Sequence, residues 1–135
     1  MRPTFTLRLH WLSLLFALGI LVVEILIATR LAHLVFVRCY LGDFLVVVLI
    51  YYLVRAFVDI PPLKLAVGVL LFACGVEIIQ LLHPADLLGL QPGSFLYILL
   101  GNRFSWVDLL MYLGGCSAAY GLDWVFPVGR RAMTP

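Results

Sequence analysis

The sequence predicts an all-α integral membrane protein, a single domain over residues 1–135 built as a bundle of four transmembrane helices. Hydrophobic side chains make up 64% of the chain and charged side chains only 12%, and the mean hydropathy is +1.13. Soluble domains average about 45–50% apolar and about 25% charged residues. The composition therefore excludes an ordinary soluble protein, and a net charge of +2 gives no reason to expect nucleic acid as a partner.

Four stretches each supply the roughly 20 mostly apolar residues that are needed to cross a bilayer. We expect spans at about 11–28, 41–58, 63–82 and 104–126. The first run resembles a signal peptide, but Glu24 interrupts it and no small-x-small cleavage site follows. We therefore interpret it as a retained first helix.

Prolines and glycines define the segments between the later spans. The motif "DIPPL" at residues 59–63 separates the second and third spans into a tight hairpin, because proline cannot continue a helix. Residues 83–103 contain two prolines and three glycines around an apolar patch that is too short to span. We expect an interfacial or re-entrant segment there.

The basic residues predict that both termini are cytoplasmic. This orientation places six of the nine lysines and arginines inside, namely Arg2, Arg8, Arg55, Lys64, Arg130 and Arg131. We interpret Arg55 and Lys64 as topology signals of this kind. The remaining arginines, at positions 30, 38 and 103, then lie outside. Four carboxylates within the spans come to a similar depth near the outer face, namely Glu24, Asp43, Glu77 and Asp108.

Charged residues within the spans predict a shared polar pocket that opens to the outside. A charge at the centre of a span costs about 2.5–3.5 kcal/mol, so carboxylates in helices should face one another and pair with arginines as a partly protonated set. Helical spacing places Gln80 on the same face as Glu77, and Tyr112 on the same face as Asp108. The expected pocket residues are Glu24, Arg38, Asp43, Glu77, Gln80, Arg103, Asp108 and Tyr112.

Two Arg–Asp pairs also indicate an internal repeat. Arg38 and Asp43 are separated by four residues, as are Arg103 and Asp108, and each pair opens an even-numbered span. Each pair also follows a helix that carries a glutamate. This pattern is typical of a 2+2 parallel repeat of helical hairpins about an axis along the membrane normal.

Structural roles for the same residues stay open. Glu77 and Gln80 also suit a hydrogen-bonded clamp between helices, and Asp43 and Asp108 suit first-turn positions favoured by the helix dipole. The small residues at 114–121 predict close packing of the fourth helix, against the third. Tyr51 is expected at the floor of the pocket together with Tyr112.

No metal or other cofactor is expected. Cys39, Cys74 and Cys116 are odd in number and widely spaced, so they predict neither a disulfide framework nor a zinc motif.

Three stretches carry a resemblance to a known family: "FVRCYLGDFLVVVLIYYLVRAF", "KLAVGVLLFACGVEIIQLL" and "LGNRFSWVDLLMYLGG". In this order and spacing they resemble the DUF2809 family of small bacterial four-helix membrane proteins. The resemblance implies four spans and the bacterial inner membrane but no activity. Glu77, Gln80 and Asp108 are more distantly similar to the VanZ-like proteins associated with glycopeptide resistance, although Tyr112 and Gly115 stand where those proteins have asparagine and glycine.

Three functions fit the sequence. The preferred one is a binding module whose pocket engages an anionic or zwitterionic envelope molecule, such as a lipid-linked cell-wall precursor. The second is a membrane enzyme acting on an envelope lipid, with Glu77 or Asp108 as general acid or base, although no nucleophile or metal motif completes such a site. The third is an accessory subunit of a membrane complex or homo-oligomer, whose buried charges fix helix packing. Membrane lipid is the expected partner of all three.

Overall fold

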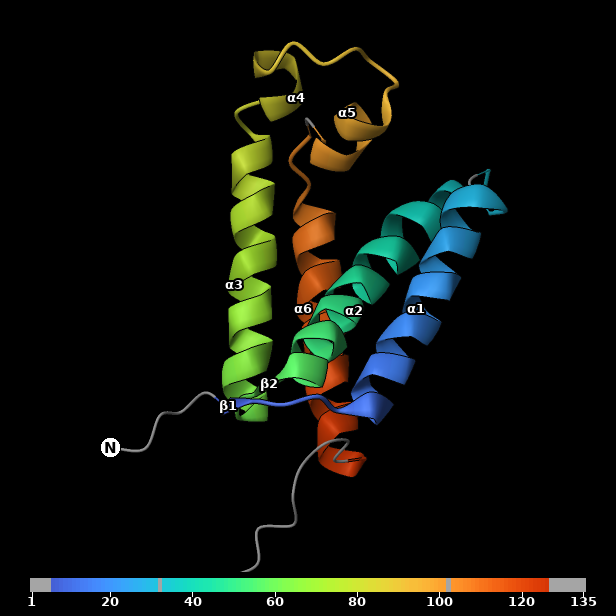
Figure 1. Cartoon of the computed structure of the whole chain (residues 1–135). Coiled ribbons are helices and arrows are strands. Elements are labelled where there is room, and N and C mark those ends of the chain that lie inside the picture. Colours follow the sequence, from blue (N-terminus) through green and yellow to red (C-terminus); the bar gives the residue numbers. More distant parts are fainter. Residues whose placement is uncertain (1–5, 32, 102, 127–135) are drawn as a thin grey trace, which may run out of the picture.

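Four long helices account for most of the computed structural model, which describes residues 6–31, 33–101 and 103–126. They run alternately up and down (Figure 1) and are α1 (Trp11–Thr29), α2 (Gly42–Phe57), α3 (Pro62–Gln80) and α6 (Trp106–Val125). Each begins and ends within two residues of a stretch expected as a span. The apolar runs of the sequence therefore coincide with the helices.

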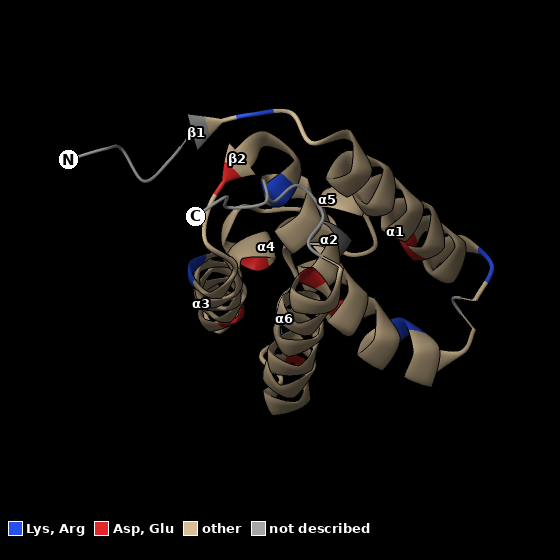
Figure 2. Cartoon of the chain, turned by 90° about the horizontal axis from the view of Figure 1, so that it is seen from below, with Lys and Arg blue, Asp and Glu red and all other residues tan. Residues whose placement is uncertain are grey.

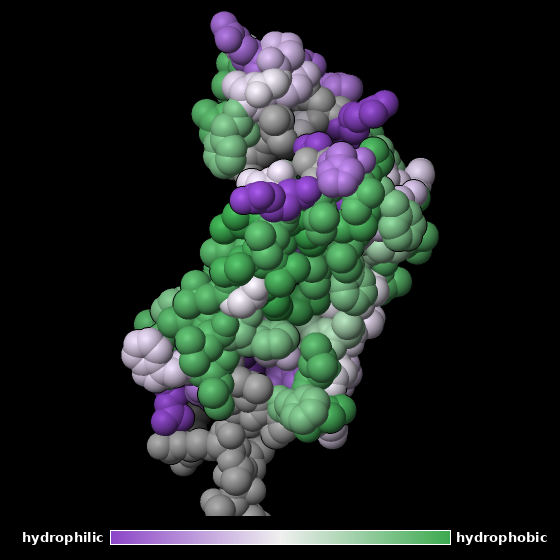
Figure 3. Space-filling model, turned by 90° about the vertical axis from the view of Figure 1, so that its right-hand side faces the viewer, coloured by the Kyte–Doolittle hydropathy of each residue, from purple (hydrophilic) through white to green (hydrophobic). Residues whose placement is uncertain are grey.

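The helices identify a membrane protein. Within the described residues three helical segments are long and apolar enough to cross a bilayer: Trp11–Thr29, Val37–Phe57 and Pro62–Gln80. The surface seen in Figure 3 is a broad hydrophobic belt with hydrophilic groups at its two ends. α6 is as long as these three but is not among them. Its two aspartates and its run of glycine, serine and tyrosine lower its hydropathy.

α2 and α6 together form the centre of the packing. α6 lies between α2 and α3, and α1 packs against the other side of α2 (Figure 2). Gly115 of α6 lies so close to the Phe44 carbonyl and the Val47 side chain that an added Cβ would overlap α2. The small residues of α6 therefore permit close approach of α2 as well as packing against α3. α2 and α3 are joined by the short connection 58–61, where the sequence predicted the turn of a hairpin, but they contact each other less than either contacts α6.

A short β-ladder lies at the end of the bundle where the described chain begins and ends (Figure 1). β1 (Thr6–Leu7) pairs antiparallel with β2 (Val58–Asp59). The amide of His10 also donates to the carbonyl of Ala56 at 2.7 Å. These bonds tie the segment before α1 to the end of α2.

The opposite end of the bundle carries three short elements. The π-helical turn η1 (Val37–Leu41) runs directly into α2, and α4 (Pro84–Leu87) and α5 (Phe95–Leu100) lie between α3 and α6 (Figure 1). α4 and α5 are far too short to cross a bilayer. They lie beyond the end of α3 and connect it to the start of α6.

Candidate functional site: an acidic cavity between four helices

A cavity of about 480 Å³ lies at the end of the bundle away from the β-ladder, among residues late in α1 and α3 and early in α2 and α6. Its size falls within the range of roughly 300–1,000 Å³ that is typical of ligand sites. α1 and α3 end near it, whereas α2 and α6 begin near it, so residues late in two helices meet residues early in the other two. Its polar lining consists of Glu24, Arg38, Asp43, Glu77, Gln80, Asp108 and Tyr112.

The lining of this acidic cavity carries more negative than positive groups. Glu24, Asp43, Glu77 and Asp108 come from four different helices, and Arg38 is the single arginine among the described lining residues. The rest of the wall is largely apolar and includes Val46, Ile50, Phe72, Val76 and Phe95. Phe72 and Phe95 are largely exposed and lie at its rim.

Asp43 and Asp108 form the centre of the carboxylate set. Asp43 lies close enough to Asp108, Glu24 and Glu77 to interact electrostatically with all three. Among the described residues no group of three or more His, Cys, Asp and Glu side chains has a geometry that could hold a metal ion.

Glu77 and Gln80 hold the start of α6. Glu77 is 1% exposed, and its Oε2 accepts from the Ser105 amide at 3.1 Å. Its Oε1 accepts from the Tyr112 hydroxyl at 3.3 Å. The Gln80 amide nitrogen donates to the Leu100 carbonyl at 3.0 Å. These are the contacts of a clamp between α3 and the segment that precedes α6, formed by residues that also line the cavity.

Glu24 and Asp43 have no such structural explanation. Glu24 Oε1 is buried and has no hydrogen-bond partner within residues 6–31, 33–101 and 103–126. Because η1 continues into α2, Asp43 does not lie at a free helix N-terminus, so the helix dipole does not account for it.

Asp108 does lie in the first turn of its helix, but it is not the cap of α6. Ser105 is the N-cap, and its hydroxyl accepts from the Asp108 amide at 3.3 Å.

Arg38 and Arg103 occupy different local structures. Arg38 is exposed on η1 and lines the acidic cavity, whereas Arg103 lies outside any helix. Arg103 lines an adjoining hollow of about 400 Å³, which shares Asp108 with the acidic cavity. The two Arg–Asp pairs therefore match in sequence spacing but differ in backbone conformation.

Comparison with known proteins assigns the chain to a family. The model of a protein family of unknown function, DUF2809, matches residues 32–116. The chain belongs to the DUF2809 family. The segment that matches DUF2809 contains every polar residue of the cavity lining except Glu24, which precedes it. No curated protein and no solved structure matches the chain.

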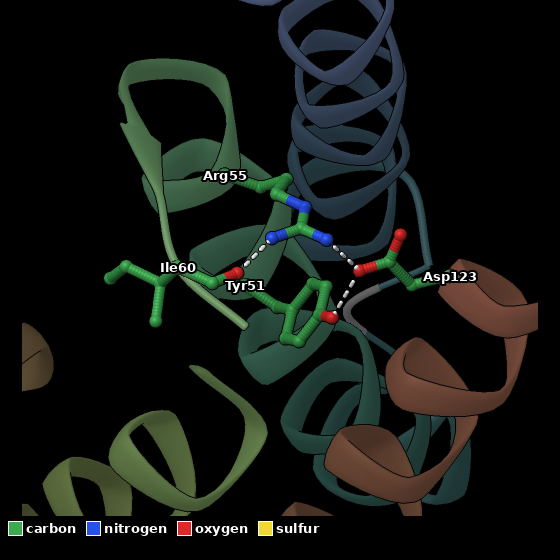
Figure 4. Close-up of polar contacts among 4 residues, drawn as sticks. All are labelled: Tyr51, Arg55, Ile60 and Asp123. Carbon is green, nitrogen blue, oxygen red and sulfur yellow. Dashed lines mark hydrogen bonds and ion pairs between the residues drawn. The ribbon is translucent and has the colours of Figure 1, made fainter. Parts of the chain in front are cut away.

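A second polar centre, at the other end of the bundle, was not predicted from the sequence. Arg55 is 2% exposed, and its Nη2 lies 2.6 Å from Oδ2 of Asp123, which is fully buried (Figure 4). The Tyr51 hydroxyl donates to the same oxygen at 2.5 Å, and Arg55 Nη1 donates to the Ile60 carbonyl. The interpretation of Arg55 as a topology signal is therefore wrong. Tyr51 belongs to this buried group and does not line the acidic cavity.

One signal in the sequence could have found this centre. Tyr51 and Arg55 are four residues apart and so share a helix face. Asp123 is an acidic residue near the end of α6, at the depth where α2 also ends.

Proposed function

We propose that this DUF2809 protein binds the headgroup of a zwitterionic envelope lipid or lipid-linked molecule in its acidic cavity. The observation that carries the proposal is the convergence of Glu24, Asp43, Glu77 and Asp108, each from a different helix, on one cavity beside Arg38. Ionisable residues within membrane helices are costly and usually mark sites of function. A cavity that binds a polar headgroup would explain why four carboxylates are kept within these helices despite that energetic cost.

The charges favour a zwitterion over an anion. An anionic molecule would meet one arginine and four carboxylates. A headgroup with an ammonium and a phosphate can instead place its cation beside Asp43 and Asp108 and its anion beside Arg38. Of the two ligand classes that the sequence suggested, the zwitterionic one therefore fits the cavity better.

The backbone beside Arg38 supports a binding role. π-Helical turns are rare and occur frequently at functional sites. η1 carries Arg38 and directly precedes Asp43, so this turn sets the positions of one cation and one carboxylate of the lining.

We further propose that α6 is a fourth span of a bacterial inner-membrane protein whose termini are cytoplasmic. α6 is 20 residues long and packs between two helices that are apolar enough to span. Arg30, Arg38 and Arg103 are exposed near the cavity end, whereas Arg8 and Lys64 are exposed near the β-ladder. The 2+2 parallel repeat is part of this proposal, since in both Arg–Asp pairs the aspartate lies in the first turn of a long helix and the arginine precedes that helix.

A structural role is the second candidate function, and one observation favours it. Both carboxylate oxygens of Glu77 and the amide nitrogen of Gln80 already have protein partners, namely Ser105, Tyr112 and Leu100. An accessory membrane subunit would need such buried contacts to fix helix packing and would need no ligand.

Lipid retention by the extracted protein tests the proposal. Native mass spectrometry would compare the wild type, Asp43→Asn and the control Asp86→Asn after exposure to phosphatidylethanolamine or phosphatidylglycerol at matched folded yield. Asp86 is exposed on α4 and does not line the cavity, so Asp86→Asn makes the same chemical change as Asp43→Asn but away from the site. We expect the wild type and Asp86→Asn to retain phosphatidylethanolamine preferentially and Asp43→Asn to lose the preference.

Two results would count against binding. Equal retention of phosphatidylethanolamine by Asp43→Asn and the wild type contradicts the proposal. A fall in folded yield alone, with a defined membrane protein co-purifying, supports the accessory role.

A further inference from the structure

An apolar groove continues from the acidic cavity along the bundle. It has a volume of about 530 Å³ and lies between α2 and α3. Ile50 of α2 and Phe72 of α3 line both the cavity and this α2–α3 groove, so the two are contiguous. The other residues that line the groove are Val54, Ile60, Pro61, Lys64, Leu65, Gly68 and Val69.

The packing of the helices explains why the groove is open. α3 packs mainly against α6, and α2 packs against α1 and α6, which leaves the seam between α2 and α3 loosely filled. Gly68 adds no side chain to the wall, and a Cβ at this position would meet no atom within 4 Å. The groove is therefore a hollow at a surface of two helices that are apolar enough to face the hydrocarbon core.

Together the cavity and the groove run along almost the whole of α3. Gln80 marks the cavity end and Lys64 the groove end, and 16 residues of helix at 1.5 Å per residue cover about 24 Å. One leaflet supplies about 15 Å, half of a hydrocarbon core of about 30 Å. The combined site therefore passes the midplane of the bilayer.

We infer that the α2–α3 groove holds the long polyprenyl chain of a lipid-linked envelope molecule whose zwitterionic headgroup lies in the acidic cavity. The inference rests on the proposed function and names its ligand class. The acyl chains of a phospholipid held by its headgroup in the cavity end near the midplane and leave the groove unfilled. A polyprenyl chain continues past the midplane, and its branched hydrocarbon suits walls formed by Val54, Leu65 and Val69.

Binding of two polyprenyl phosphoethanolamines that share one headgroup tests the inference. One carries a long polyprenyl chain and the other only a geranyl chain. Each would be titrated against the purified full chain as wild type, as Gly68→Phe, which fills the groove, and as Gly19→Phe. Gly19 is the matched control because it is an exposed helix glycine whose added Cβ would also meet nothing within 4 Å.

We expect Gly68→Phe to weaken binding of the long-chain probe by about tenfold, the effect of losing roughly 1.4 kcal/mol of contact. Binding of the geranyl probe should stay unchanged, and Gly19→Phe should bind both probes as the wild type does. Gly68→Leu repeats the measurement with a smaller side chain if Gly68→Phe does not fold. Undiminished long-chain binding by a folded Gly68 variant overturns the groove assignment.

Asp43→Asn separates this inference from the proposed function. If the headgroup site is correct, Asp43→Asn weakens binding of both probes, because both present the same ammonium. If Asp43→Asn leaves both unchanged while Gly68→Phe still weakens the long chain, the groove binds polyprenyl hydrocarbon and the headgroup proposal fails.

Discussion

Arg55 of α2 and Asp123 of α6 form a buried ion pair with an Nη2–Oδ2 distance of 2.6 Å. The pair joins the ends of two helices whose first turns line the acidic cavity, so it lies at the far end of these helices from that cavity. Tyr51 and the carbonyl of Ile60 complete it (Figure 4). The polar residues of the bundle are thus divided between an ion-paired centre at one end and a predominantly acidic cavity at the other.

Breaking this ion pair should destabilise the protein strongly. Arg55→Met leaves Asp123 without its cation, and Asp123→Leu leaves the guanidinium without its anion. Removal of one partner from a buried pair costs about 3–5 kcal/mol. We expect each single variant to lower the melting temperature of the detergent-extracted protein, whereas Lys64→Met, at an exposed position, should change it little.

The double variant Arg55→Met/Asp123→Leu distinguishes a true pair from two independent polar residues. Because neither charge is left alone, its loss of stability should be smaller than the sum of the two single losses. Additive losses would show that Arg55 and Asp123 do not stabilise each other.

Gly115 should be essential for the contact between α6 and α2. A Cβ at this position would overlap the Phe44 carbonyl and the Val47 side chain, and overpacking of this kind costs about 1–3 kcal/mol. Gly121→Ala on the same helix is the matched control, because its Cβ would meet nothing within 4 Å. Alanine there should stabilise the helix by about 0.5–1 kcal/mol. The midpoint temperature of thermal unfolding should therefore fall in Gly115→Ala and rise in Gly121→Ala. Equal shifts in the two variants would contradict this packing.

Gly101 should be needed for the clamp made by Gln80. Its φ is +65°, and an added Cβ would lie 2.7 Å from Gln80 Nε2, which donates to the Leu100 carbonyl. Gly89 also has a positive φ, of +68°, but has open space around it, so Gly89→Ala is a control without the clash. We expect Gly101→Ala to cost about 0.5–1.5 kcal/mol more than Gly89→Ala in chemical unfolding, the usual contribution of one hydrogen bond. In a Gln80→Ala background the difference should shrink, because the clash with the Gln80 side chain is then removed.

The helices and the meeting of the carboxylates follow from the sequence for simple reasons. Long apolar runs identify the helices, and their alternating direction brings Glu24, Asp43, Glu77 and Asp108 to one end. The packing arrangement of the helices does not follow from the sequence, because hydropathy does not determine which helices pack against α6. Arg55 near a helix end has the same pattern as an interfacial arginine, and its partner lies 68 residues away.

Arg103 shows a second limit of the sequence. The sequence placed it with Arg38 because both precede an aspartate by the same spacing. The direction of a side chain outside a helix depends on the backbone of the connecting segment, and this spacing does not encode that backbone. Arg103 therefore lines the adjoining hollow and not the acidic cavity.

Arg38 should contribute to the affinity for a phosphate-containing headgroup. Arg38→Gln removes the single cation of the described cavity lining, whereas Arg30→Gln removes an exposed arginine at the same end that does not line it. A hydrogen bond to a charged group contributes about 1.5–3 kcal/mol, so phosphatidylethanolamine binding should weaken about ten- to hundredfold in Arg38→Gln alone. Equal weakening by both variants would indicate a general surface charge effect.

The cavity end of the bundle should face the outside of the cell, and Cys39 reports on it directly. Cys39 is exposed on η1, whereas Cys74 is half-buried and Cys116 is buried. A membrane-impermeant maleimide should therefore label the wild-type chain in sealed right-side-out vesicles and fail to label it in sealed inside-out vesicles. Cys39→Ser should abolish the signal, which assigns it to this thiol. Labelling only in inside-out vesicles would reverse the orientation, and the acidic cavity would then open to the cytoplasm.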